Sequence, residues 1–291
     1  MYHVLFFLLK LLSYIPFWAL YIVSDCLYFP LYYVIRYRRG VVRKNLVESF
    51  PHKSLDEIIK IEKAFYRYFA DQVLETCKMA SVSQEQILRR MKFVNVEKVK
   101  AVMEQGRSVA LYMGHYGNWE WTSSLPLWLG EEMKVIQIYH QLANVNVDRL
   151  MLYIRGRMGG KNVEMRKTAR YITGMASSKE TGIIGFIADH SPRKKDATYF
   201  IPFLNHNTPV ITGTERVMKR CGLSAWFLDV RRVKRGYYEA EFVEIEDNSR
   251  QLPDFELTHR YFRLLEKMIL RNPEFYLWTH KRFKYATRLD A

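Results

Sequence analysis

The stretch GHYGNWE, from Gly114 to Glu120, places a histidine and a glutamate in a His-x4-Glu arrangement. Near physiological pH a neutral imidazole can remove the proton of a hydroxyl group, which is what acyl transfer from a thioester to an alcohol requires. A carboxylate on the other ring nitrogen would fix the tautomer of the imidazole and stabilise the imidazolium that forms. We therefore interpret His115 as a general base and Glu120 as its orienting partner.

The spacing by itself is weak evidence. The chain has 8 histidines and 30 acidic residues, and His52 with Glu57 shows the same arrangement. Glu57 is better explained by a capping box with Ser54, which stands at the start of an apolar helical pattern. Glu120 has an alternative explanation of the same kind, because an acidic residue in the first turn of a helix interacts favourably with the helix dipole.

The residues around His115 predict a strand, a tight turn and a helix. Ser108–Met113 is an apolar run that indicates a buried strand, and Gly114 and Gly117 allow the backbone to turn tightly and approach a ligand. Asn118 can cap the helix that follows, and we also expect it among the substrate-binding residues. Loops at the carboxyl ends of strands are where α/β domains place their sites, so this position suits a catalytic group.

The chain beyond residue 50 alternates between strand-like and helical patterns. Strand-like runs cover residues 92–96, 108–113, 134–139, 182–188, 224–231 and 237–245. Helical patterns cover residues 55–79, 119–130, 145–158, 166–178, 210–221 and 254–271. This alternation predicts an α/β fold with a mixed sheet flanked by helices, and we assign residues 36–291 to one catalytic domain.

Residues 1–35 form the most apolar part of the chain and are expected to associate with a membrane. Lys10 and Asp25 are the only charged side chains there, and Pro16 and Pro30 interrupt the helical pattern. Either one span or a pair of interfacial helices fits this composition. A basic cluster follows at Arg36, Arg38, Arg39, Arg43 and Lys44, which indicates the cytoplasmic side and an affinity for anionic lipid.

Composition agrees with a membrane partner. The net charge is +15, and 15% of the residues are aromatic, with 20 Tyr and 17 Phe. Tyr and Trp favour membrane–water interfaces, so an anionic lipid surface is favoured over nucleic acid.

Cys26, Cys77 and Cys221 show no disulfide or metal spacing, and we expect a reducing compartment and no metal site. Lys281, Arg282 and Lys284 are interpreted as an interfacial patch.

Five blocks of sequence occur in an order that is typical of one family. They are the apolar amino terminus with VVRKNLVESFP, GHYGNWEW, YIRGRMGG, FIADHSPRKKDATYFIPFLNHNTPV and NPEFYLWTHKRFK. With these blocks the chain resembles the bacterial lipid A biosynthesis late acyltransferases of the lauroyl and myristoyl transferase type. That family belongs to the glycerophosphate/lysophospholipid acyltransferase superfamily.

The resemblance implies roles for several residues. It implies that His115 is the base and Glu120 its partner, and it adds Arg155 (with Arg157 as the alternative) and Asp189 as substrate-binding residues. Arg193 and Lys194 occupy the basic part of the same block, where they would hold phosphates. The family often has Asp-Gln where this chain has Asp189-His190, which puts a role for His190 in doubt.

The resemblance also implies an activity and its partners. The enzyme would move a fatty acyl group from acyl-carrier protein or a CoA thioester to a hydroxyl of an anionic lipid A precursor, at the cytoplasmic face of the inner membrane. It would need no metal and no other cofactor. Alternative acceptors are a lysophospholipid, an aminoacyl lipid or a phosphoinositide mannoside. The rival from another class is a basic membrane-tethered protein without catalytic activity, which leaves the ordered blocks unexplained.

Overall fold

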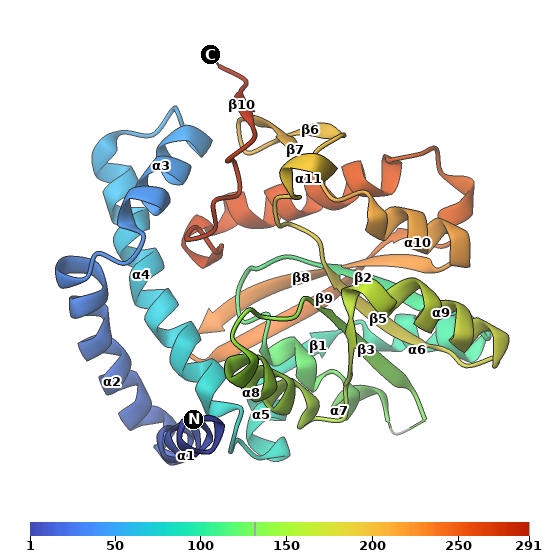
Figure 1. The fold of residues 1–291 in the computed structure, drawn as a ribbon, viewed down its shortest axis with the longest axis horizontal. Helices are drawn as coiled ribbons and strands as arrows, with labels where there is room; N and C mark the ends of the chain where they lie inside the picture. Colours follow the sequence, from blue (N-terminus) through green and yellow to red (C-terminus); the bar gives the residue numbers. More distant parts are fainter. Residues whose placement is uncertain (131, 291) are drawn as a thin grey trace.

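A computed structural model describes residues 1–130 and 132–290. Its centre is a seven-stranded mixed sheet with helices on both faces, which confirms the predicted fold class (Figure 1). The strand order is β1 (Met91–Val94), β9 (Tyr237–Glu246), β8 (Ser224–Lys234), β2 (Val109–Met113), β5 (Gly182–Ile187), β3 (Lys134–Tyr139) and β4 (Lys161–Glu164). The predicted strands match β1, β2, β3, β5, β8 and β9, whereas β4 was not predicted.

The strand directions decide where the site forms. Strands β8, β2, β5, β3 and β4 run parallel to one another, whereas β9 pairs antiparallel with β8. Strand β2 lies between β8 and β5, and its residues Val109–Tyr112 are buried, as expected for a strand covered on both faces. The carboxyl ends of β2, β5 and β3 therefore meet at one edge of the sheet.

Helices cover both faces of the sheet, and the first four helices pack together beside it. They are α1 (Tyr2–Tyr14), α2 (Phe17–Phe29) with the π-helical η1 (Pro30–Val34), α3 (Arg39–Ser49), α4 (Leu55–Lys78), α5 (Gln84–Arg90), α6 (Val96–Glu104), α7 (Pro126–Leu129), α8 (Val145–Gly156), α9 (Thr168–Ser177), α10 (Gly213–Cys221) and α11 (Glu256–Arg271). Short 3-10 turns occur at η2 (Trp121–Ser124), η3 (Met165–Lys167), η4 (Lys194–Asp196), η5 (Ser249–Gln251) and η6 (Pro273–Phe275). Helix α11 lies on one face of the sheet and α6 on the other (Figure 1).

Local signals explain several of these elements. Ser54 and Glu57 form the predicted capping box at the start of α4, so the structure confirms the simpler explanation of Glu57. The helix expected over residues 119–130 is instead the 3-10 turn η2 followed by the short helix α7, with Pro126 as the first residue of α7. Proline has no N–H to donate, so it starts a new helix rather than continuing the old one.

A three-stranded antiparallel sheet lies near the carboxyl terminus. It contains β10 (Thr287–Arg288), β7 (His206–Pro209) and β6 (Phe200–Phe203) in that order. At the opposite end of the molecule, α1 and α2 pack against α4 on the side away from the sheet (Figure 1). Residues 17–34 form a helical segment that is long and apolar enough to cross a membrane.

Candidate active site

His115 and Asp189 meet at the carboxyl edge of the sheet. Nδ1 of His115 lies 2.7 Å from Oδ1 of Asp189, and the backbone N–H of His115 donates to Oδ2 of the same carboxylate at 3.0 Å. The parallel register that pairs Met113 with Ile187 brings the two loops together. Nδ1 is therefore occupied as a donor, and Nε2 remains as the basic nitrogen.

The position predicted for Glu120 is thus filled by another carboxylate. Glu120 accepts two hydrogen bonds from Arg155 of α8, at 2.8 Å from Nε and at 2.6 Å from Nη2. Glu120 is close to His115 in sequence, but its side chain points toward Arg155 of α8. Asp189 lies in the loop after β5, the strand adjacent to β2, and this loop lies beside His115. The orienting partner of His115 in this structure is Asp189.

The environment of Asp189 keeps it ionised. Its side chain is 1% exposed, and this burial alone would raise its pKa. The positive charge of His115 and the hydrogen bonds from His115 outweigh burial and hold the pKa of Asp189 well below its usual range. A buried carboxylate that stays charged can stabilise an imidazolium beside it.

Arg155, rather than Arg157, reaches the site. Arg157 instead donates to the backbone carbonyls of Met79 and Val82, the latter at 3.2 Å, so it holds the chain between α4 and α5. Burial disfavours the charged form of Arg155, but the charge and hydrogen bonds of Glu120 outweigh it and raise the pKa of this guanidinium. The guanidinium of Arg155 therefore stays charged beside Glu120.

A cavity of about 230 Å³ connects these groups to the sheet. His115, Glu120, Arg155 and His190 line it. Its apolar walls come mainly from the strands and from the segment after β2, through Leu111, Met113, Leu125, Val135, Ile136, Ile138, Ile183, Ile187 and Leu228. Such a cavity offers an apolar chain a mainly apolar wall beside the ring of His115.

Arg193 and Lys194 do not reach this cavity. The side chain of Arg193 is 73% exposed and pairs with Asp196 at 2.9 Å, and Lys194 is exposed in the turn η4. Neither residue lines the cavity, so the expected phosphate contacts would have to form at the surface.

Asn118 is fully buried and lies outside the lining of the cavity. Its Oδ1 accepts from the backbone N–H of Trp121 at 3.1 Å, and its Nδ2 donates to Oε2 of Glu75 at 2.7 Å. The expectation that Asn118 binds substrate does not fit this position. Asn118 instead fixes the start of the turn that carries Glu120.

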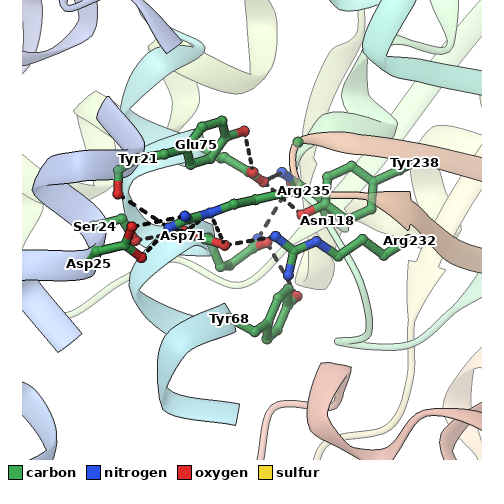
Figure 2. A network of polar contacts seen from close by, with 12 residues as sticks. Tyr21, Ser24, Asp25, Tyr68, Asp71, Glu75, Asn118, Arg232, Arg235 and Tyr238 are labelled. Atoms are coloured by element: carbon green, nitrogen blue, oxygen red, sulfur yellow. Dashed lines mark hydrogen bonds and ion pairs between the residues drawn. The ribbon is translucent and has the colours of Figure 1, made fainter. Parts of the chain in front are cut away.

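Asn118 belongs to a buried polar network that the sequence did not reveal (Figure 2). Its centre is Asp71 and Glu75 on α4, which bind Tyr21 and Ser24 of the amino-terminal segment and Arg232, Arg235 and Tyr238 of the β8–β9 hairpin; Arg235 also binds Asp25. Burial, followed by the nearby charge of Asp71, raises the pKa of Glu75 to about 7. The sequence feature that could have indicated this network is the spacing of Asp71 and Glu75, which lie one helical turn apart on the buried face of α4.

The carboxyl-terminal segment also supplies residues to the site. His280 stacks on His190, which itself stacks on His115, and Arg282 is 1% exposed, with Nη1 donating to Thr208 Oγ1 at 2.8 Å. The interpretation of Arg282 as part of an interfacial patch is therefore wrong, whereas Lys281 and Lys284 are exposed. No spacing in the sequence links residues so far apart.

The chain was compared with known proteins. A family model described as bacterial lipid A biosynthesis acyltransferase matches residues 2–285. The lipid A biosynthesis palmitoleoyltransferase of Escherichia coli (strain K12) is 26% identical over 255 residues, which cover 86% of this chain and 80% of that protein. The lipid A biosynthesis lauroyltransferase of the same organism is 24% identical over 249 residues, which cover 85% and 79%. A lipid A biosynthesis acyltransferase of Shigella flexneri is 26% identical over 255 residues.

The family match spans both the amino-terminal helices and the site at the edge of the sheet. It agrees with the resemblance found in the five sequence blocks. The chain belongs to the family of bacterial lipid A biosynthesis acyltransferases, which are O-acyltransferases.

Proposed function

We propose that the enzyme moves a fatty acyl group from an acyl-carrier thioester to a hydroxyl of a lipid A precursor, with His115 as the general base. The observation that carries this proposal is the pairing of His115 with the buried Asp189 beside an apolar cavity. A base with a free Nε2 and an apolar space next to it is what O-acyl transfer from a fatty thioester needs.

The reaction follows from this geometry. Nε2 of His115 takes the proton of the acceptor hydroxyl while the hydroxyl oxygen attacks the thioester carbonyl. The C–S bond then breaks, and the imidazolium returns the proton to the leaving thiolate. Asp189 holds the Nδ1–H tautomer and stabilises the charge on the ring, and positioned acid–base catalysis contributes roughly 10²- to 10⁴-fold in rate.

Glu120 and Arg155 are given a role different from that of His115 and Asp189. Because both line the cavity and bind each other, we propose that they position the reacting groups beside His115. The exposed Arg193 and Lys194 are proposed to meet phosphates of the glycolipid at the protein surface, where lysine and arginine contribute charge. The acyl chain of the donor, acyl-carrier protein or CoA, would occupy the apolar cavity.

We further propose that the amino terminus lies in one leaflet of the cytoplasmic membrane, with the catalytic domain in the cytoplasm. Helix α1 has 13 residues, about 20 Å at 1.5 Å per residue, and is too short for a hydrocarbon core of about 30 Å. Helix α2 runs along α4, with Tyr21 Oη donating to Glu75 at 2.8 Å and Ser24 Oγ to Asp71 at 2.7 Å. A span could not keep these polar contacts in hydrocarbon.

The other faces of the two helices are apolar and exposed. The exposed side chains are Val4, Phe7, Leu8, Leu11, Tyr14, Trp18, Ile22, Val23 and Phe29, followed by Val34 and Ile35. The basic cluster from Arg36 to Lys44 comes next in the chain, where it would meet anionic headgroups. A face of this kind suits helices that lie in the plane of the membrane.

The proposed activity is tested with purified protein in detergent. Labelled acyl-carrier protein and acyl-CoA donors are offered with a lipid A precursor, a lysophospholipid and an aminoacyl lipid. We expect transfer to the lipid A precursor, its loss in His115→Ala, and full activity in His52→Ala, whose side chain is exposed and outside the cavity. Transfer that persists in His115→Ala contradicts the role of the base, and transfer only to another lipid contradicts the acceptor.

The membrane arrangement is tested by labelling. A cysteine-containing tag is placed before Met1 in a variant whose Cys26, Cys77 and Cys221 are replaced by serine. A membrane-impermeant maleimide should label the tag in inside-out vesicles and leave it unlabelled in spheroplasts. Labelling in spheroplasts would indicate a complete span.

A further inference from the structure

The ring of His190 covers the ring of His115, and a third histidine, His280, stacks on His190. The centroids of His115 and His190 lie 4.0 Å apart with an interplanar angle of 4°, and those of His190 and His280 lie 4.2 Å apart with an angle of 20°. The ring of His190 is therefore stacked between the proposed base and His280. We call these residues the histidine stack.

Independent parts of the fold hold the stack in place. His190 follows Asp189 in the loop after β5, so the residue that binds Nδ1 of His115 is directly joined to the residue that covers its face. His280 comes from the carboxyl-terminal segment, and its Nε2 accepts from the backbone N–H of Ser191 at 3.3 Å. Asn45 Nδ2 donates to the carbonyl of His280 at 2.9 Å.

The two added rings are neutral at physiological pH. Burial, followed by the charge of His115, lowers the pKa of His190 to about 3. Burial also lowers the pKa of His280 to about 4, although the charge of Asp189 acts in the opposite direction. The other charged groups that face these rings are Arg282, for both of them, and Lys284, for His280. Cations on that side favour neutral imidazoles, so neither His190 nor His280 carries a charge beside His115.

His190 acts through the face of its ring rather than through a hydrogen bond. Its Nε2 is buried and has no hydrogen-bond partner among residues 1–130 and 132–290. A neutral aromatic face attracts a cation placed over it. The cation that forms in this site during the reaction is the imidazolium of His115.

We propose that His190 is a positioning residue for the base: its ring fixes the plane of the His115 imidazole and stabilises the imidazolium, and His280 supports it from the other side. This inference rests on the proposed role of His115. The proton moves from the acceptor hydroxyl to Nε2 of His115 and then to the leaving thiolate, and His190 and His280 exchange no proton.

The test compares His190→Phe with His190→Leu. Neither side chain can form a hydrogen bond or titrate, and they differ in the aromatic face. We expect His190→Phe to keep kcat close to that of the unaltered enzyme and His190→Leu to lower kcat about three- to tenfold. His52→Leu serves as the control for the loss of an exposed histidine.

The pH profile separates this effect from a general loss of structure. Without the aromatic face the imidazolium of His115 is less stable, so the base loses its proton more readily. The acidic limb of kcat/KM against pH should therefore move to lower pH by about half a unit in His190→Leu and stay in place in His190→Phe. His190→Gln, which is polar and not aromatic, should behave like His190→Leu and replaces it if that variant does not fold.

Three results would overturn the inference. Equal activity in the Phe and Leu variants would show that the aromatic face is not used. An equal loss in both, with the acidic limb unchanged, would assign the role to a ring nitrogen. A drop in His190→Leu that matches a fall in its thermal midpoint would indicate packing alone. Failure of the base itself is distinct, because it would appear as retained transfer in His115→Ala.

Discussion

At the scale of single residues, the two carboxylates of the site differ in the partner that each one binds. Asp189 binds the ring of His115, and Glu120 binds the guanidinium of Arg155. Because the two carboxylates have different partners, we expect their substitution to give different kinetic signatures.

Asp189→Asn removes the charge beside His115 and keeps the shape of the side chain. We expect kcat to fall by roughly 10²- to 10⁴-fold, because an amide stabilises the imidazolium poorly and favours the wrong tautomer. The acidic limb of kcat/KM should move to lower pH, since a less stable imidazolium loses its proton more readily. Steady-state kinetics over a range of pH measures both changes.

Glu120→Gln gives the contrast. It breaks the bidentate pair with Arg155, whose two hydrogen bonds measure 2.6 and 2.8 Å, and does not touch His115. We expect KM to rise while the acidic limb of kcat/KM stays in place. If Glu120→Gln moved that limb and Asp189→Asn did not, Glu120 would be the orienting carboxylate after all.

At the scale of elements, helix α4 joins the amino-terminal helices to the catalytic turn. Glu75 accepts from Tyr21 Oη at 2.8 Å, from Tyr238 Oη at 2.8 Å and from Asn118 Nδ2 at 2.7 Å (Figure 2). The contacts cross from α2 through α4 to the loop after β2. A change in the charge of Glu75 therefore acts on all of these elements together.

Glu75→Gln should change how stability depends on pH. The pKa of Glu75 is raised from 4.5 to about 7 in the folded protein, so folding favours its protonated form. The stabilisation from this group is fully present below about pH 4.5 and is lost as the pH rises through about 7. Between pH 5 and 8 the unaltered enzyme should lose on the order of 2 kcal/mol relative to Glu75→Gln.

Thermal midpoints of both proteins across this pH range, recorded in one detergent, measure that difference. Parallel curves for the two proteins would mean that Glu75 keeps one charge state throughout the range. Glu85, which lies exposed in α5, gives the matched control Glu85→Gln.

The packing between β2 and β5 should set the length of the acyl chain. Gly185 and Met113 both line the cavity, and a Cβ at Gly185 would lie 2.9 Å from the flexible end of the Met113 side chain. Gly185→Ala should displace that methyl group and reduce the space for the chain. Each buried methylene contributes about 0.8 kcal/mol, so we expect a preference for donors shorter by about one or two carbons.

Competition between acyl donors of different length, followed by mass spectrometry of the product, measures this preference. Gly174 in α9 has open space where a Cβ would be, so Gly174→Ala is the control. An unchanged product distribution in Gly185→Ala would place the acyl chain elsewhere.

At the scale of the whole molecule, the amino-terminal helices are part of the packed body as well as the proposed membrane surface. Lys78 Nζ donates to the carbonyls of Ser13 and Ile15 at 2.6 and 2.7 Å, and Arg235 pairs with Asp25 at 2.7 Å. Both printed acceptors of Lys78 belong to the amino-terminal segment, whereas Arg235 also binds Asp71 of α4 at 2.7 Å.

Deletion of residues 1–35 should therefore do more than release the protein from membranes. It removes both carbonyl partners of Lys78 and one partner each of Glu75 and Asp71, and it exposes to water the face of α4 that α2 covers. We expect an aggregated or less stable product, measured by size-exclusion chromatography and circular dichroism.

A variant that alters only the exposed apolar face is the matched control. Phe7, Leu11, Trp18 and Ile22 are more than half exposed, so their replacement by serine should weaken binding to vesicles and leave the fold intact. A stable, soluble and active deletion variant would show that the amino terminus is a separate anchor.

The sequence alone determined the class of fold and the apolar helical character of the amino terminus, and it supplied His115 as the proposed base. These features depend on local patterns: the apolar run before Gly114, the capping box at Ser54 and the uncharged stretches around Asp25. Hydrophobic periodicity and turn chemistry act over a few residues, so they can be read without a structure.

The tertiary structure decided which groups act together. Strands β2 and β5 are far apart in sequence and adjacent in the sheet, and only this adjacency gives His115 the carboxylate of Asp189 in place of that of Glu120. The stacking of His280 on His190 and the burial of Arg282 depend in the same way on where the carboxyl-terminal segment packs. Contacts between distant segments follow from sheet order and packing, which local patterns do not specify.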